Sequence, residues 1–79
     1  MIDQRWDEMY AYSKQLRLQE QTRRYSIVAL PEGWEVREER DSQVVRRVHY
    51  QDWHRVERAR QSFTIKLREL KASGWTVES

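Results

Sequence analysis

Residues 25–50 read YSIVALPEGWEVREERDSQVVRRVHY, and this stretch decides the fold that the sequence predicts. It contains three runs, at residues 25–30, 34–40 and 44–50. The first is apolar and partly β-branched, and the second alternates apolar with charged residues. Such runs are typical of β-strands. Residues 31–33 and 41–43 separate the runs and hold the proline, glycine, aspartate and serine that turns favour. The stretch therefore predicts a three-stranded antiparallel meander.

A register follows from asking which pairing keeps the large apolar side chains on one face. That register consists of five cross-strand pairs: Leu30 with Trp34, Val28 with Val36, Val36 with Val48, Trp34 with Tyr50, and Glu38 with Arg46. The reverse face then holds polar and charged side chains: Glu35, Arg37, Glu39, Arg47 and His49. The run 25–30 is apolar on this face too, so we expect either the helix predicted before it or another chain to cover it.

Two helices are expected to flank the meander. Residues 3–23 predict the first, because Asp3 can cap its start and its apolar side chains gather on one half of the helical wheel. Residues 52–72 predict the second, opened by Asp52 or Gln51. This helix carries an apolar stripe suited to packing on a sheet: Trp53, Val56, Ala59, Phe63, Leu67 and Leu70.

The end of the second helix is also readable in the sequence. Ser73 and Gly74 stop it, and Trp75 can supply the apolar contact of a Schellman-type cap. Residues 77–79 are expected to form a loose tail. The summed prediction is one small α+β domain over residues 1–79, in the order α-β-β-β-α, with a three-stranded antiparallel meander packed against helix.

Composition limits the classes of protein to which the chain can belong. The 79 residues include no cysteine, which excludes disulfides, thiolate metal sites and thiol catalysis. No apolar run approaches the roughly 20 residues that cross a bilayer, so we expect a cytoplasmic protein that does not enter the membrane. Fifteen Lys and Arg residues against thirteen Asp and Glu leave a net charge of only +2, which permits nucleic-acid binding without favouring it.

Catalysis is not expected. The histidines and carboxylate at His49, Asp52 and His54 are legitimate metal ligands, but their spacing matches no zinc signature. Asp52 is more simply a helix cap, with the two histidines at the surface. No glycine-rich phosphate loop or jointly acting pair of carboxylates is present. We therefore expect no enzyme, no cofactor, no metal and no small-molecule substrate.

Protein binding is the leading functional hypothesis. Leu18 and Ile65 fall on the polar sides of their predicted helices, and the run 25–30 places Tyr25 and Ile27 on a face that the meander leaves open. Single exposed apolar residues are ordinary in soluble proteins. Several of them in so short a chain indicate an interface, with a protein partner or a second copy. A protein-binding adaptor or regulator, acting alone or as a homodimer, is the function that this pattern favours.

Nucleic-acid binding is the alternative. Arg46 and Arg47 lie near the end of one predicted strand, and Arg55 and Arg58 share a face of the following helix. Guanidinium groups at such a junction are suited to contacting phosphates. Because acidic residues alternate with basic ones throughout the chain, a plainly solvated charged face explains the same pattern. The sequence leaves these alternatives open.

Two short resemblances accompany these patterns. Residues 30–35, Leu-Pro-Glu-Gly-Trp-Glu, resemble the opening of a WW domain, a three-stranded meander that binds proline-rich peptides. The second tryptophan and proline of that family are missing here. The order α-β-β-β-α is similar to that of the double-stranded-RNA-binding domain, but its lysine-rich second helix start is replaced by Gln-Asp-Trp-His-Arg at residues 51–55. Neither family is assigned.

Overall fold

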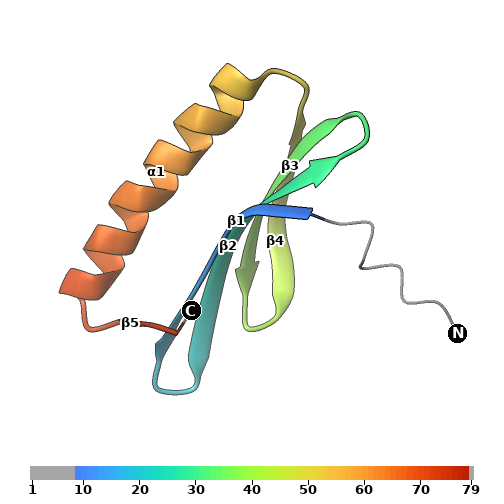
Figure 1. The fold of residues 1–79 in the computed structure, drawn as a ribbon. Coiled ribbons are helices and arrows are strands. Elements are labelled where there is room, and N and C mark those ends of the chain that lie inside the picture. Colours follow the sequence, from blue (N-terminus) through green and yellow to red (C-terminus); the bar gives the residue numbers. More distant parts are fainter. Residues whose placement is uncertain (1–8, 79) are drawn as a thin grey trace, which may run out of the picture.

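One antiparallel sheet covered on one face by a single long helix forms the structure (Figure 1). A computed structural model describes residues 9–78. Within them the elements are β1 (Met9–Leu18), β2 (Gln21–Leu30), β3 (Gly33–Arg40), β4 (Gln43–Tyr50), α1 (Trp53–Ala72) and β5 (Thr76–Val77). The strand order is β4-β3-β2-β1-β5. The α+β class is therefore confirmed, whereas the order α-β-β-β-α is wrong.

The predicted first helix is wrong over its described part, because residues 9–18 form β1 and residues 21–23 begin β2. Its opening residues, 3–8, lie outside the described residues. Tyr12 and Leu16 satisfy an alternating pattern as well as a helical one, so periodicity alone does not decide between them. The deciding factor is β2, whose outer edge needs a hydrogen-bonding neighbour. The predicted first helix therefore covers nothing: β1 pairs with the edge of β2, and α1 covers the face that holds Tyr25 and Ile27.

The β1–β2 turn gives no signal in the sequence. Leu18 pairs directly with Gln21, leaving a loop of only Gln19 and Glu20. Gln19 adopts a φ of 57°, in the left-handed region that glycine or asparagine usually occupies. With neither residue type nor a proline present, the pattern of turn residues could not reveal this hairpin.

The register between β2 and β3 differs from the predicted one by a single residue. Leu30 pairs with Gly33, and Ile27 rather than Val28 pairs with Val36, because the loop is two residues long instead of three. A one-residue change turns every side chain of a strand to the other face. Tyr25 and Ile27 therefore face α1.

The predicted pairs between β3 and β4 are confirmed: Val36 with Val48, Trp34 with Tyr50, and Glu38 with Arg46. A close approach supports the start of this hairpin. Gly33 has a φ of +133°, and a Cβ atom on it would press into the carbonyl oxygen of Tyr50. Only glycine fits both the dihedral angle and the space.

The ends of α1 form as the sequence predicts. The Asp52 carboxylate accepts a hydrogen bond of 2.9 Å from the His54 N–H, which satisfies a free donor of the first turn. At the other end, the Trp75 N–H donates to the Leu70 carbonyl and the Gly74 N–H to the Lys71 carbonyl. This is the Schellman arrangement, and it turns the chain back toward the sheet.

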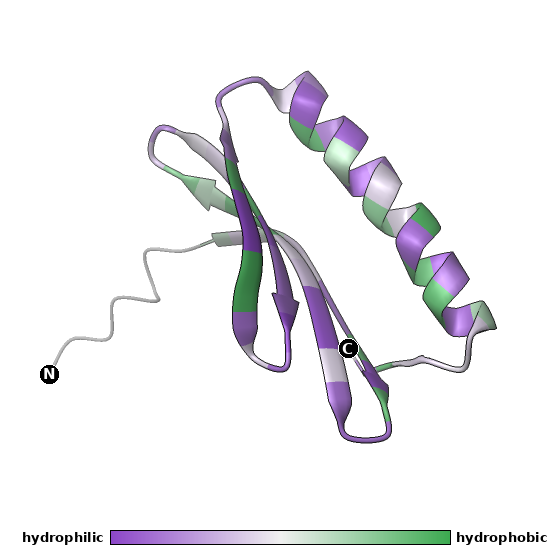
Figure 2. Cartoon of the chain, turned by 180° about the vertical axis from the view of Figure 1, so that it is seen from behind, coloured by the Kyte–Doolittle hydropathy of each residue, from purple (hydrophilic) through white to green (hydrophobic). Residues whose placement is uncertain are grey.

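The core lies between α1 and the middle of the sheet. Its buried residues come from three strands, the helix and its cap: Leu16, Tyr25, Ile27, Val36, Val56, Phe63 and Trp75. The Phe63 ring lies 5.0 Å from that of Tyr25 and 6.0 Å from that of Tyr12. Figure 2 shows hydrophobic residues interspersed with hydrophilic ones along α1, as a helix with one buried stripe requires.

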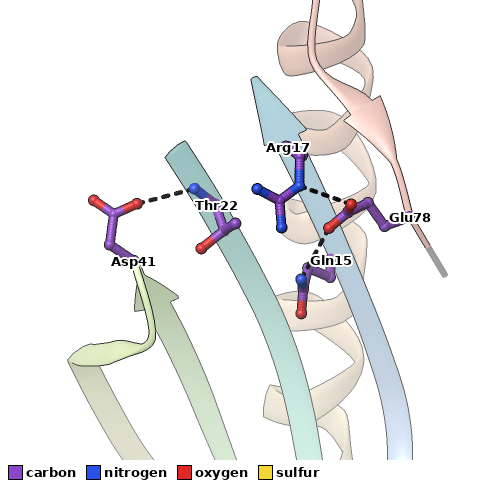
Figure 3. Close-up of polar contacts among 5 residues, drawn as sticks. All are labelled: Gln15, Arg17, Thr22, Asp41 and Glu78. Carbon is purple, nitrogen blue, oxygen red and sulfur yellow. Dashed lines mark hydrogen bonds and ion pairs between the residues drawn. The ribbon is translucent and has the colours of Figure 1, made fainter. Parts of the chain in front are cut away.

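The expected loose tail is wrong for the described residues 77 and 78. Thr76 and Val77 form β5 and pair with the end of β1. Glu78 continues this contact, because its carboxylate accepts hydrogen bonds from Arg17 Nε (2.8 Å) and Gln15 Nε2 (2.9 Å) (Figure 3). The Arg17 hydrogen bond lowers the pKa of Glu78 below its usual value. The Asp41 carboxylate, in the β3–β4 turn, likewise accepts a hydrogen bond of 2.9 Å from the Thr22 N–H of β2.

Replacement of Phe63 by alanine tests how the layers are held together. Phe63 is buried and Ile65, two residues away on the same helix, is 54% exposed. We expect Phe63→Ala to lower the free energy of unfolding by about 3–5 kcal/mol, and Ile65→Ala to change it by less than about 0.5 kcal/mol. Urea denaturation followed by tryptophan fluorescence measures both, and Phe63→Leu serves if the alanine variant does not fold. Equal losses for the two alanine variants would contradict this packing.

Candidate binding groove

A groove of about 430 Å³ runs between α1 and β4. We call it the α1–β4 groove. Its apolar surface comes from both layers: Val36, Val48, Tyr50, Ala59 and Phe63. It exists because α1 lies over the middle of the sheet and leaves the flank of β4 uncovered. The volume lies within the range of ligand-binding pockets, and the surface combines apolar and charged groups as such sites do.

Four cationic side chains line the groove: Arg46 from β4, and Arg55, Arg58 and Lys66 from α1. One carboxylate, Glu38, lies among them and accepts contacts from Arg46 (3.3 Å) and Lys66 (3.4 Å). Arg55 and Arg58 form no ion pair with any residue that the structure describes. The groove therefore carries an excess of three positive charges.

The helix is the main source of this charge. Residues 53–72 hold six Lys and Arg residues and two Glu residues, a balance of +4 in a chain whose net charge is +2. The cations of the groove follow one flank of α1 at intervals of three to eight residues. Lys66 extends the flank that Arg55 and Arg58 begin, so helical spacing could have added it to the predicted set.

The strand β4 is a free edge of the sheet along its whole length. It stands at one end of the strand order, and no other described strand pairs with its outer side. Val44 and Val45, which follow the β3–β4 loop, are 43% and 55% exposed. The register shifts here, because Glu38 pairs with Arg46 and Glu39 with Val44. Unpaired edges of this kind accept additional strands.

Arg47 does not belong to the groove. It lies on the opposite face of the sheet, where its Nε is 2.6 Å from a Glu35 carboxylate oxygen that Arg37 also contacts at 3.0 Å. Neighbouring strand residues point to opposite faces, so Arg46 and Arg47 cannot both line one surface. Three of the four residues predicted to bind nucleic acid therefore line the groove, and Arg47 lies outside it.

The predicted protein-binding residues do not form one surface. Tyr25 and Ile27 are 4% and 1% exposed in the core beneath α1, so the expectation that they lie on an open face is wrong. Leu18 is partly buried and packs against the same core. Only Ile65 is well exposed. The one-residue register error explains the outcome, because it placed the buried face of β2 outside.

The remaining candidates are separated. His49 pairs with Glu35 in the sheet ladder, whereas His54 begins α1 and Asp52 caps it. Among residues 9–78, no three His, Cys, Asp or Glu side chains lie together in a way that could hold a metal ion. Trp53, 38% exposed, packs against Trp34 with ring centroids 5.1 Å apart, and so extends the aromatic surface at the start of α1.

Stability should fall with acid because of the Glu35 cluster. The Arg37 hydrogen bond, more than the charges of Arg37, Arg47 and His49, holds the pKa of Glu35 below its usual 4.5, against the opposing effect of burial. A lowered pKa stabilises the folded state above the unfolded value, and that stability is lost as the pH falls through the folded value. We expect urea midpoints to drop below about pH 4.5, and to drop less in Glu35→Gln.

The control for this prediction is Glu32→Gln, in the exposed β2–β3 loop. Its urea midpoints should follow those of the parent protein across the same pH range. An unchanged acid dependence in Glu35→Gln would show that other groups carry the effect.

The groove and the free edge of β4 are suited to recognition: one offers cations around an apolar floor, and the other offers unpaired main-chain groups. No helix among residues 9–78 is long and apolar enough to cross a membrane. Comparison of the chain with protein-family models, with curated proteins and with solved structures finds no match.

Proposed function

We propose that this protein is a binding module that captures an extended segment of a protein partner along β4. The observation that carries the proposal is the coincidence of a full-length free edge strand with a groove on its flank. β4 is eight residues long, whereas the opposite edge of the sheet is β1, shielded at its end by β5. The proposed interface therefore lies on a different strand from the run 25–30 that the sequence indicated, which forms part of the interior strand β2.

Strand addition uses both features together. A segment that pairs with β4 gains main-chain hydrogen bonds, and its alternate side chains enter whatever pockets lie beside the edge. Here the side chains on the α1 side would enter the α1–β4 groove, above Val48 and Tyr50. The exposed Val44 and Val45 add apolar contact near the hairpin loop. Main-chain bonds would supply affinity, and the groove would supply selectivity.

Selection from a library of displayed random twelve-residue peptides tests this function. We expect enriched peptides that slow amide hydrogen exchange in β4, because added main-chain bonds protect an edge strand. The control measurement is exchange in β1, at the far side of the sheet, which should not change. Failure to enrich any peptide, or protection outside β4 and α1, would contradict the proposed function.

A second candidate function is binding of single-stranded nucleic acid. The observation that favours it is the convergence of Arg46, Arg55, Arg58 and Lys66 around an aromatic floor. Cationic grooves with aromatic side chains hold phosphates and stack unpaired bases. The same groove would then take a polynucleotide in place of a peptide.

Salt dependence distinguishes this second function. Each phosphate contact on a single strand adds about 0.7 to the slope of log affinity against log salt. The double variant Arg55→Ala/Arg58→Ala should therefore lower the slope by about 1.4 for a thymidine oligonucleotide. The matched control is Arg47→Ala/Arg68→Ala, which removes two cations outside the groove. Tryptophan fluorescence gives the affinities, and equal slopes for the two double variants would contradict phosphate binding in the groove.

A further inference from the structure

We infer that the partner segment is acidic, with two carboxylates four residues apart on the side that faces α1 and an apolar residue midway between them. This inference rests on the proposed function, because it specifies the strand that β4 captures. It comes from the distribution of charge along the α1–β4 groove and not from the free edge alone.

The two ends of the groove are cationic and its middle is apolar. Arg46 pairs with Glu38, which Lys66 also contacts at 3.4 Å, so Arg46 and Lys66 mark one end. Arg55 lies near the start of α1, close along the chain to Tyr50 at the other end of β4. Val48 stands midway between Arg46 and Tyr50 on the same face. A strand beside β4 would therefore meet positive, apolar and positive surroundings at every second residue.

Glu38 already displays the recognition that we infer. It lies on the α1 side of β3, and its two oxygens contact a cation of the sheet, Arg46, and a cation of the helix, Lys66. A carboxylate on the other side of β4 would stand in the same relation to Arg46. Arg58, which forms no ion pair with a described residue, lies one turn from Arg55 and adds a second cation toward the other end of the same groove.

Charge also decides against a second copy of this chain as the occupant. β4 contains Arg46, Arg47 and His49 and no carboxylate. When two antiparallel copies of β4 overlap along their full length, Arg46 of one copy falls opposite Arg47 of the other. Like charges directly opposite each other destabilise a strand pair, whereas opposite charges stabilise it. The edge therefore disfavours its own copy and favours an acidic strand.

Two synthetic peptides of eight residues, the length of β4, test the spacing. The first is Ser-Thr-Glu-Thr-Val-Thr-Glu-Ser, with both carboxylates and the valine on one side of a strand. The second, Ser-Thr-Glu-Thr-Val-Glu-Thr-Ser, has the same composition with one carboxylate moved to the other side. At low salt, where screening is weakest, we expect the first to bind about fivefold more tightly and to shift the amide resonances of β4.

Matched variants locate the contacts. Arg55→Ala/Lys66→Ala should remove the preference between the peptides, whereas Arg68→Ala, on the same helix outside the groove, should keep it. These side chains are exposed, so the variants should fold as the parent does, which circular dichroism checks. Equal binding of both peptides, or a preference that survives in the double variant, would overturn the inference.

The library selection separates the two levels of the proposal. Enriched peptides that protect β4 but lack paired carboxylates would overturn the inference and leave the proposed function standing. No enrichment would overturn both. A thymidine oligonucleotide serves as the competitor. If it displaces the first peptide and binds the groove at least tenfold more tightly, the inference is overturned and the groove is a nucleic-acid site.

Discussion

The packing of Val56 and Phe63 against the patch of Tyr25, Ile27 and Val36 joins the two layers of this protein. Val56 and Phe63 are the only buried residues of the 20-residue helix, so α1 rests on the sheet along a narrow stripe. A helix held in this way covers the middle strands and leaves the outer ones open. The α1–β4 groove is thus a direct result of where the stripe falls, since no strand or loop among residues 9–78 fills the space beside it.

The sequence predicted the part of the chain from β3 to the end of α1 well, because local signals there agree with the tertiary structure. Asp52, Gly74 and the apolar stripe of α1 define the helix, and alternation defines β3 and β4. The segment that forms β1 and the β1–β2 turn was mispredicted, because Tyr12 and Leu16 fit a helix as well as a strand and the Gln19–Glu20 turn carries no glycine. Long-range pairing with β2 decided between them, and a single sequence does not display it.

The candidate site was partly visible for the same reason. The sequence could predict that Arg46, Arg55 and Arg58 lie together, because β4 and the start of α1 were placed correctly and only a short connection separates them. Tyr25 and Ile27 were misplaced by one residue of loop length. Arg47 was grouped with its neighbour although strand geometry sends the two side chains to opposite faces. The edge position of residues 44–50 followed from the predicted meander, whereas the strands beyond β2 were hidden, because strand order in a sheet depends on every strand being found.

The pairing of β5 with β1 has a consequence for the order in which the chain assembles. Four strands form successive hairpins, whose contacts join residues near one another in sequence and raise contact order little. The ladder from Leu16 to Val77 instead closes most of the chain into a loop, and it consists of two residue pairs. Closing so long a loop costs chain entropy, and two residue pairs offset little of that cost. We therefore expect the β1–β5 pairing to form late and to open first. The sheet thus has a pairing at β5 that forms late and opens easily, and an edge at β4 that no described strand of the chain closes.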